Sequence, residues 1–174
     1  MGIRMSKKKE IRREIITCLF WLYLLILFRI TVFRTGFGVQ NLFQKGSINL
    51  TLFRDYLPLL KEGHWFRFLY LFLGNILWFI PFGIYTIWTG RIKRGWKAVC
   101  LGFFLSLFIE TMQYCFGTGI SEADDLILNT FGTWIGAYSA IFLQNAHTKE
   151  KEKRILDGIA MEKAGRKFRK ESGK

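Results

Sequence analysis

The sequence predicts an all-α integral membrane protein with about four transmembrane helices in a small bundle. Its apolar residues gather in runs of about 20 residues, the length that crosses ~30 Å of hydrocarbon at ~1.5 Å per residue. Hydrophobic residues make up 51% of the 174-residue chain, yet the formal net charge is +13. The basic residues flank the apolar runs, as Lys and Arg do in the cytoplasmic loops of membrane proteins.

The chain begins with a basic leader over residues 1–14, and a first transmembrane anchor helix is predicted over residues 15–33. A basic start followed by an apolar run also describes a signal peptide. This run continues for about 18 residues, however, and no A-x-A-like cleavage site follows it. We therefore expect an uncleaved helix whose N-terminus lies in the cytoplasm.

Residues 34–67 are predicted to form an external connection. The stretch 48–60 is apolar, but Asn49, Arg54, Asp55 and Pro58 interrupt it. It is too short and too polar to span a bilayer. An interfacial segment at the outer surface suits it better.

Residues 68–145 are predicted to form a core of three transmembrane helices, over residues 68–88, 98–116 and 126–143. The loop between the first two is basic, whereas the loop 117–125 holds three acids and no Lys or Arg. The positive-inside rule then places the basic loop in the cytoplasm and the acidic loop outside. Residues 146–174 read as a basic cytoplasmic tail, partly helical or disordered. The predicted location is the bacterial cell membrane, with several crossings and both termini in the cytoplasm.

Polar side chains recur along these helices at helical spacing. An acid or amide inside a bilayer costs a few kcal/mol unless it faces protein or water, so such residues are functional candidates. Small residues at the same spacing let membrane helices approach closely. On one helix face lie Gly102, Ser106, Glu110, Gln113 and Gly117, and on another lie Asp125, Asn129, Gly132 and Gly136. We predict a polar pocket, open to the external leaflet, that is formed by Arg29, Asn75, Glu110, Gln113, Asp124, Asp125 and Asn129.

Structural roles for these residues stay open at this point. Asp124 or Asp125 could cap the N-terminus of the last helix, and Asn75 and Asn129 could hold helices together by hydrogen bonds. Glu110 could pair with Arg29, serve as a functional acid or lie at the lipid edge. Arg29 could instead extend to outer-leaflet phosphates. Basic residues of the external connection could contact anionic head groups; these are Arg54, His64 and Arg67.

Three blocks of the sequence together resemble the VanZ-like family of bacterial membrane proteins. The first block runs from Gly74 to Gly83 (GNILWFIPFG), the second is Glu110-x-x-Gln113, and the third runs from Asp124 to Gly132 (DDLILNTFG). The family's N-L-x-P-F block is similar to residues 49–53, with Leu52 in place of proline. The arginine that many members carry ahead of the acidic pair has no counterpart here. The resemblance implies a role in resistance to teicoplanin-type lipoglycopeptides or in cell-envelope upkeep.

Three functions fit these residues. In the first, the polar pocket engages a lipid head group, a cell-wall precursor or a lipoglycopeptide antibiotic. In the second, Glu110, Asp124 and Asp125 bind a divalent cation and activate water against a lipid-linked phosphate or ester. In the third, the polar residues serve only helix packing and partner recognition in a non-catalytic scaffold.

Membrane lipids are therefore the expected partners, and no cofactor is predicted. Nucleic-acid binding is not favoured, because the basic residues flank apolar spans and do not interleave with aromatic residues in one patch. The sequence does not indicate an oligomeric state. The three cysteines, Cys18, Cys100 and Cys115, all lie in apolar runs without C-x-x-C spacing, so neither a disulfide framework nor a zinc site is indicated.

Overall fold

The protein is an all-α membrane protein, as predicted. The computed structural model describes residues 2–33, 46–90 and 92–172, with side chains described for 7–33, 46–90 and 92–163. Within these ranges, four helices are long and apolar enough to cross a membrane. They are α1 (Gly2–Thr31), α3 (Trp65–Trp88), α4 (Gly95–Phe116) and α5 (Ala123–Ser172).

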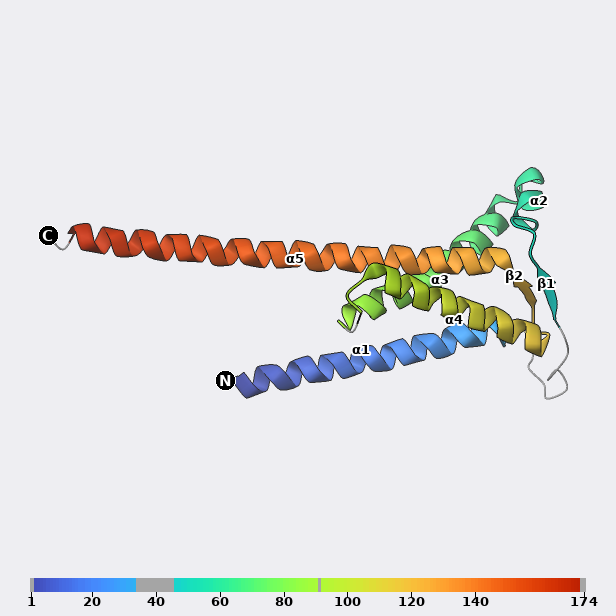
Figure 1. Ribbon diagram of the computed structural model, residues 1–174, viewed down its shortest axis with the longest axis horizontal. Helices are drawn as coiled ribbons and strands as arrows, with labels where there is room; N and C mark the ends of the chain where they lie inside the picture. The colour runs from blue at the N-terminus through green and yellow to red at the C-terminus, as the bar shows by residue number, and fades with distance from the viewer. Residues whose placement is uncertain (1, 34–45, 91, 173–174) are drawn as a thin grey trace.

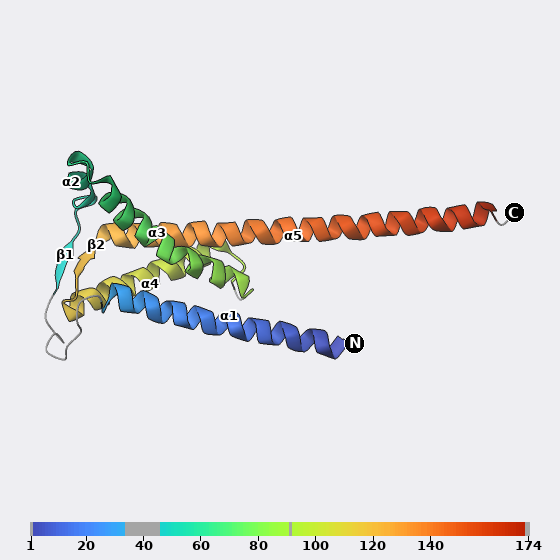
Figure 2. The ribbon, with the colours of Figure 1, turned by 180° about the vertical axis from the view of Figure 1, so that it is seen from behind.

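A short helix and two short strands close one end of the bundle. They are α2 (Tyr56–Lys61), β1 (Ser47–Asn49) and β2 (Ile120–Glu122). The N-terminus of α1, the α3–α4 connection and the extension of α5 all lie toward the opposite end (Figure 1; Figure 2 shows the same arrangement from behind). The basic α3–α4 connection and the acidic loop before α5 thus lie at opposite ends of the bundle.

Two of the helices run past the predicted membrane segments. Helix α1 includes most of the basic leader, and α5 continues through the basic tail as one helix of 50 residues. The chain has no proline after Pro81 to stop α5. An i,i+4 pair also supports the extension, because Arg154 Nη2 lies 2.6 Å from the Glu150 carboxylate.

Helices α3 and α5 form the most extensive contact in the bundle, and glycines make it close. A Cβ atom at Gly132 would collide with the backbone of Ile76, and one at Gly136 with the backbone of Ile80. A Cβ atom at Gly83 would collide with the backbone of Thr133. The close approach predicted from Gly132-x-x-x-Gly136 is confirmed. We call Gly83, Gly132 and Gly136 the glycine seam.

The first helix joins the bundle through its C-terminal part. Leu27 and Val32 are buried against Phe79 of α3 and Ile109 of α4. One turn before Leu27, the Tyr23 hydroxyl donates to the Trp78 carbonyl oxygen at 2.5 Å. Much of the rest of α1 is exposed, as expected of a helix that faces lipid.

The two strands were not anticipated from the sequence. They pair in parallel, with Ser47 opposite Ile120 and Asn49 opposite Glu122. This pairing ties the connection ahead of α2 to the loop ahead of α5. Gly117 also departs from the predicted helix face, because it ends α4 in the left-handed conformation at φ 58°.

Candidate functional site

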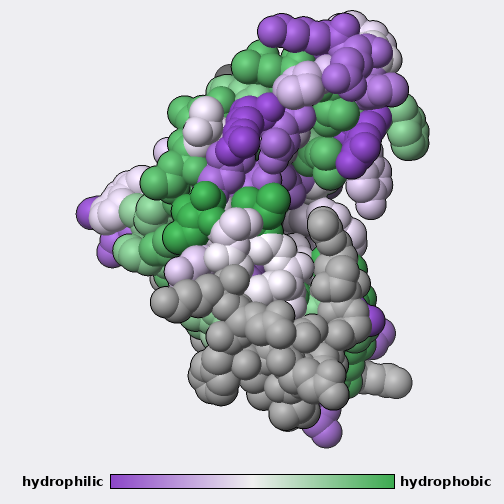
Figure 3. Space-filling view, turned by 90° about the vertical axis from the view of Figure 1, so that its right-hand side faces the viewer, coloured by the Kyte–Doolittle hydropathy of each residue, from purple (hydrophilic) through white to green (hydrophobic). Residues whose placement is uncertain are grey.

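Five carboxyl groups gather at the end of the bundle that β1, β2 and α2 close. The charges of these groups act on one another, and hydrogen bonds link them to neighbouring side chains. The residues involved come from the turn before α2 and from α2, α3, α4, β2 and α5. Figure 3 looks onto this end, where hydrophilic surface gathers beside hydrophobic residues. We call this group the acidic site; it comprises Asp55, Tyr56, Asn75, Glu110, Glu122, Asp124 and Asp125.

The Asn75 amide and the Tyr56 hydroxyl lie at the centre of the acidic site. Asn75 Nδ2 donates to the Asp125 carboxylate and, at 3.5 Å, to the Tyr56 hydroxyl oxygen. The rings of Phe68 and Phe72 pack edge-on against Tyr56 and fix its position. Burial raises the pKa of Tyr56, and the nearby carboxylates add to the rise. Its hydroxyl therefore keeps its proton and remains a hydrogen-bond donor.

Asp124 fastens the turn before α2 to the start of α5. One carboxylate oxygen, Oδ2, accepts the Phe53 backbone N–H at 2.8 Å. Phe53 has φ 57°, a conformation that costs free energy for a residue with a side chain. The other oxygen, Oδ1, is buried and has no hydrogen-bond partner among the described residues. Asp124 itself is only 3% exposed.

Glu110 reaches from α4 to the second strand. Its Oε2 accepts the Glu122 backbone N–H at 2.9 Å, and the Ser121 side chain also hydrogen-bonds to it. The Glu110 side chain is buried, and Asp125 is close enough to act on its charge. Glu110 therefore stabilises the position of β2.

Glu122 is partly exposed. Burial raises the pKa of Glu122 from 4.5 to about 8, with further contributions from a hydrogen bond to Asp55 and from the charge of Asp125. A hydrogen bond between two carboxyl groups requires a proton on one of them. The raised pKa favours the protonated form of Glu122, whose hydroxyl can then donate to the Asp55 carboxylate.

Asn129 lies one turn deeper along α5 and has a structural partner. Its Nδ2 donates to the Ser106 hydroxyl at 2.9 Å, and both side chains are buried between α4 and α5. The interpretation of Asn129 as a residue that holds helices together is therefore confirmed. Asn75 likewise connects α3 to α5, through Asp125.

Two of the predicted pocket residues lie elsewhere. Gln113 Nε2 donates to the Thr31 carbonyl oxygen of α1 at 3.2 Å. Arg29 is exposed and donates to the Phe33 carbonyl oxygen. Among the described residues no ion pair joins Arg29 to Glu110. The structure thus brings together Asn75, Glu110, Asp124 and Asp125, with Asn129 below them, and separates Arg29 and Gln113 from this group.

The side chains of the acidic site are not arranged as a metal centre. Nowhere in the described ranges do three or more His, Cys, Asp or Glu side chains form a group that could hold a metal ion. Glu110, Asp124 and Asp125 contribute instead to hydrogen bonds with the backbone or with Asn75. The ligand set of the hydrolase hypothesis is therefore not assembled.

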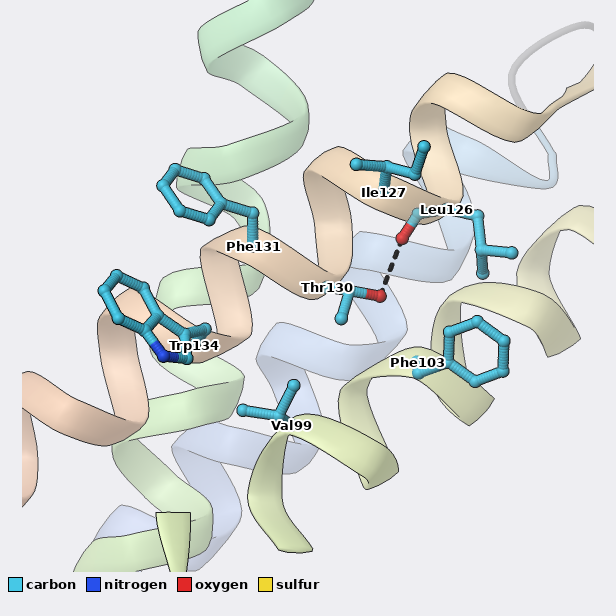
Figure 4. A pocket seen from close by; sticks show the side chains of 7 residues that line it. All are labelled: Val99, Phe103, Leu126, Ile127, Thr130, Phe131 and Trp134. Carbon is cyan, nitrogen blue, oxygen red and sulfur yellow. Dashed lines mark hydrogen bonds between the residues drawn. The ribbon is translucent and has the colours of Figure 1, made fainter. Parts of the chain in front are cut away.

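An apolar groove of about 440 Å³ lies between α4 and α5, below the acidic site (Figure 4). The hydroxyl of Thr130 in its wall donates to the Leu126 carbonyl oxygen at 2.7 Å, so it offers no free hydrogen to the groove. The groove begins on α5 at Leu126, the residue after Asp125. It is lined by Val99, Phe103, Leu126, Ile127, Thr130, Phe131 and Trp134.

Sequence reasoning missed Tyr56 and the partners of Glu122. The apolar and polar alternation from Ser47 to Leu52 is a strand signal, and β1 occupies its first three residues. Pairing this strand with β2 would have placed Asp55 and Tyr56 beside the acidic loop. Arg54, His64 and Arg67 of the same connection are exposed, and His64 lies 3.6 Å from Glu62.

Comparisons with known proteins identify a family for this chain. Residues 20–144 match the family model described as VanZ/LLP1. The chain is also similar to Protein VanZ of Enterococcus faecium, with 28% identity over 133 residues that cover 75% of this chain and 76% of that protein. No solved structure matches. The matched region contains α3, α4, the C-terminal part of α1, the apolar part of α5 and all five carboxyl groups of the acidic site. The chain belongs to the VanZ/LLP1 family.

Proposed function

We propose that this protein lies in the bacterial plasma membrane and binds the polar head of an envelope molecule at the acidic site. Its ligand is an envelope lipid, a cell-wall precursor or a lipoglycopeptide antibiotic, and binding lowers susceptibility to teicoplanin. The observation that carries the proposal is the convergence of Asn75, Glu122 and Asp125, which are partly exposed, at one end of the bundle. Polar groups of this kind persist in membrane proteins where they face water or a ligand.

The charge distribution supports an outward orientation for the acidic site. The opposite end of the bundle carries Lys7, Lys8 and Lys9 of α1 and Lys93, Arg94 and Lys97 around the start of α4. Basic residues collect on the cytoplasmic side of membrane proteins. In this orientation both termini are cytoplasmic. Residues 68–145 form the binding core, and the anchor helix and the external connection pack against it.

Asp125→Asn tests the binding proposal. The change keeps the side chain's size but removes its charge, which weakens charge-assisted hydrogen bonds to a ligand. In a strain where the wild-type protein raises the inhibitory concentration of teicoplanin, we expect most of that increase to disappear. Membrane abundance of each variant is measured in parallel. Asp157→Asn, on the exposed extension of α5, is the matched control and should behave as wild type.

A scaffold role is the second candidate, and specific contacts favour it. Three side chains of this region are buried and form hydrogen bonds between different elements of the fold, namely Glu110, Asp124 and Asn129. If the acidic site served only folding, Asp125→Asn would reduce resistance only together with membrane abundance. Loss of resistance at normal abundance would instead support binding, and unchanged resistance at normal abundance would contradict it.

A further inference from the structure

An apolar surface lies outside the four long helices, at the end of the bundle that β1, β2 and α2 close. Five large apolar side chains of β1, α2 and the turn between them are between 43% and 76% exposed: Ile48, Leu50, Leu52, Phe53 and Leu57. We call these five residues the apolar platform. Large exposed apolar surfaces are rare on proteins surrounded by water, and they mark contact with a membrane, a ligand or another protein. The platform therefore requires a covering partner.

The apolar platform adjoins the lipid-facing side of α3. Four exposed side chains follow one another along α3 at steps of four, three and four residues, so they share one face: Phe66, Tyr70, Leu73 and Leu77. Because α3 is long and apolar enough to cross a membrane, this face lies against acyl chains. The face begins at Phe66, which is 85% exposed, and a tight turn joins it to α2, since the His64 N–H donates to the Leu59 carbonyl oxygen at 2.8 Å. Lipid is thus the neighbour already present beside the platform.

Basic side chains accompany the apolar platform. Arg54 lies in the turn before α2, Lys61 ends α2, and Arg67 lies in the first turn of α3. All three are exposed, and none forms an ion pair with another described residue. Basic residues at a membrane surface attract anionic phospholipids, and a guanidinium can bind two phosphate oxygens at once. A second copy of the chain would bring the same positive charges to the contact, so anionic lipid is the complementary partner.

The fold holds the apolar platform at a fixed depth. On α2, Tyr56 is buried against α3, whereas its neighbour Leu57 is exposed. In the turn before α2, the Asp124 carboxylate accepts the Phe53 backbone N–H. Helix α2 lies at the same end of the bundle as the C-terminus of α4 and the start of α5 (Figure 1), where the membrane-crossing segments end. This end of the bundle is the level of the lipid head groups, so the platform meets the interface between head groups and acyl chains.

We propose that the apolar platform docks into the bilayer leaflet at this end of the bundle. Its apolar side chains enter the acyl region, and Arg54, Lys61 and Arg67 bind the phosphates of anionic phospholipids. The platform is a lipid-binding surface separate from the acidic site, because Tyr56 and Leu57 point to different sides of α2. The inference goes beyond the proposed function and applies to either orientation of the bundle.

The first test measures the depth of the apolar platform. The three cysteines of the full chain are changed to alanine, and one new cysteine carries the fluorophore NBD in nanodiscs of phosphatidylglycerol and phosphatidylcholine. A doxyl-labelled lipid quenches a label in the bilayer, and iodide quenches a label in water. We expect lipid quenching at Leu57→Cys to be at least about fivefold that at Asp157→Cys, on the exposed extension of α5, and similar to that at Leu73→Cys, on the lipid-facing side of α3.

Two outcomes of the depth measurement would overturn the inference. Iodide quenching at Leu57→Cys equal to that at Asp157→Cys would show that the platform faces water. Protection from both quenchers would show that a second copy or another protein covers it. A label at Leu50→Cys repeats the measurement at a second platform residue, outside α2.

The second test measures the contribution of the basic side chains. The label at Leu57→Cys is quenched by doxyl-labelled phosphatidylglycerol or by doxyl-labelled phosphatidylcholine at equal mole fraction. We expect phosphatidylglycerol to quench at least about twofold more strongly, because anionic lipid gathers at basic residues. Combining Arg54→Gln, Lys61→Gln and Arg67→Gln should abolish this preference.

A matched control changes three basic residues elsewhere. Lys149→Gln, Lys151→Gln and Lys153→Gln lie together on the exposed extension of α5, so the preference at the platform should persist in this triple variant. Equal quenching by the two lipids without these substitutions would refute the binding of phosphates at the platform. A preference that survives the removal of the three platform charges would refute it as well.

Discussion

The glycine seam and the acidic site hold the same helices together by opposite means. At the seam, the absence of side chains at Gly83, Gly132 and Gly136 brings the backbones of α3 and α5 into contact. At the acidic site, Asn75 and Asp125 bridge these two helices through a hydrogen bond. Burial of apolar surface does not drive helices together in lipid, so close packing and hydrogen bonds must do so. Only the second means leaves groups that a ligand can use.

The largest effect should come from the seam. Gly132→Ala places a methyl group against the Ile76 backbone, which cannot move without separating α3 from α5. We expect a loss of at least about 3 kcal/mol, at the upper end of overpacking costs. The loss of stability is measured by heating the purified protein in detergent and monitoring the disappearance of its monodisperse peak.

Gly74→Ala is the matched control on α3. A Cβ atom there meets nothing within 4 Å, so only helix propensity changes. We expect unchanged or slightly higher stability. Equal destabilisation by both substitutions would contradict the assignment of the seam.

A smaller effect is expected at the Asn129–Ser106 hydrogen bond, which joins α4 to α5. A double-mutant cycle with Asn129→Ala and Ser106→Ala should give a coupling free energy of about 0.6 kcal/mol, as is usual for hydrogen bonds between membrane helices. Additive effects of the two substitutions would show that the bond contributes nothing. Resistance at equal membrane abundance should be unchanged, in contrast to Asp125→Asn.

The last prediction concerns the pH dependence of stability. The raised pKa of Glu122 means that the folded protein prefers its protonated form. This contribution to stability is complete below pH 4.5 and is lost as the pH rises through about 8. The glutamine side chain of Glu122→Gln stays neutral at every pH. The Tm of this variant should therefore fall less than that of the wild type between pH 4.5 and about 8. Glu152→Gln, on the exposed extension of α5, should keep the wild-type profile.

Helix positions and the seam followed from the sequence because their signals are local. Apolar runs long enough to cross a bilayer predicted the four spans, and α3 and α4 begin within a few residues of the expected positions. Gly132-x-x-x-Gly136 predicted a close contact because residues four apart share a helix face. The same spacing grouped Glu110 with Gln113. It did not show that Gln113 turns toward Thr31 of α1.

The sequence by itself thus determined the membrane class, the helices and the residues that each helix face carries. Only the tertiary structure decided which faces meet. Parallel pairing of Asn49 with Glu122 joins segments far apart in the chain, and it brings Asp55 and Tyr56 to the acids of α5. Helical periodicity orients a residue about its own axis and carries no information on the neighbouring element. For that reason the sequence placed Arg29 in the predicted pocket, whereas in the structure Arg29 donates to the Phe33 carbonyl oxygen at a separate place.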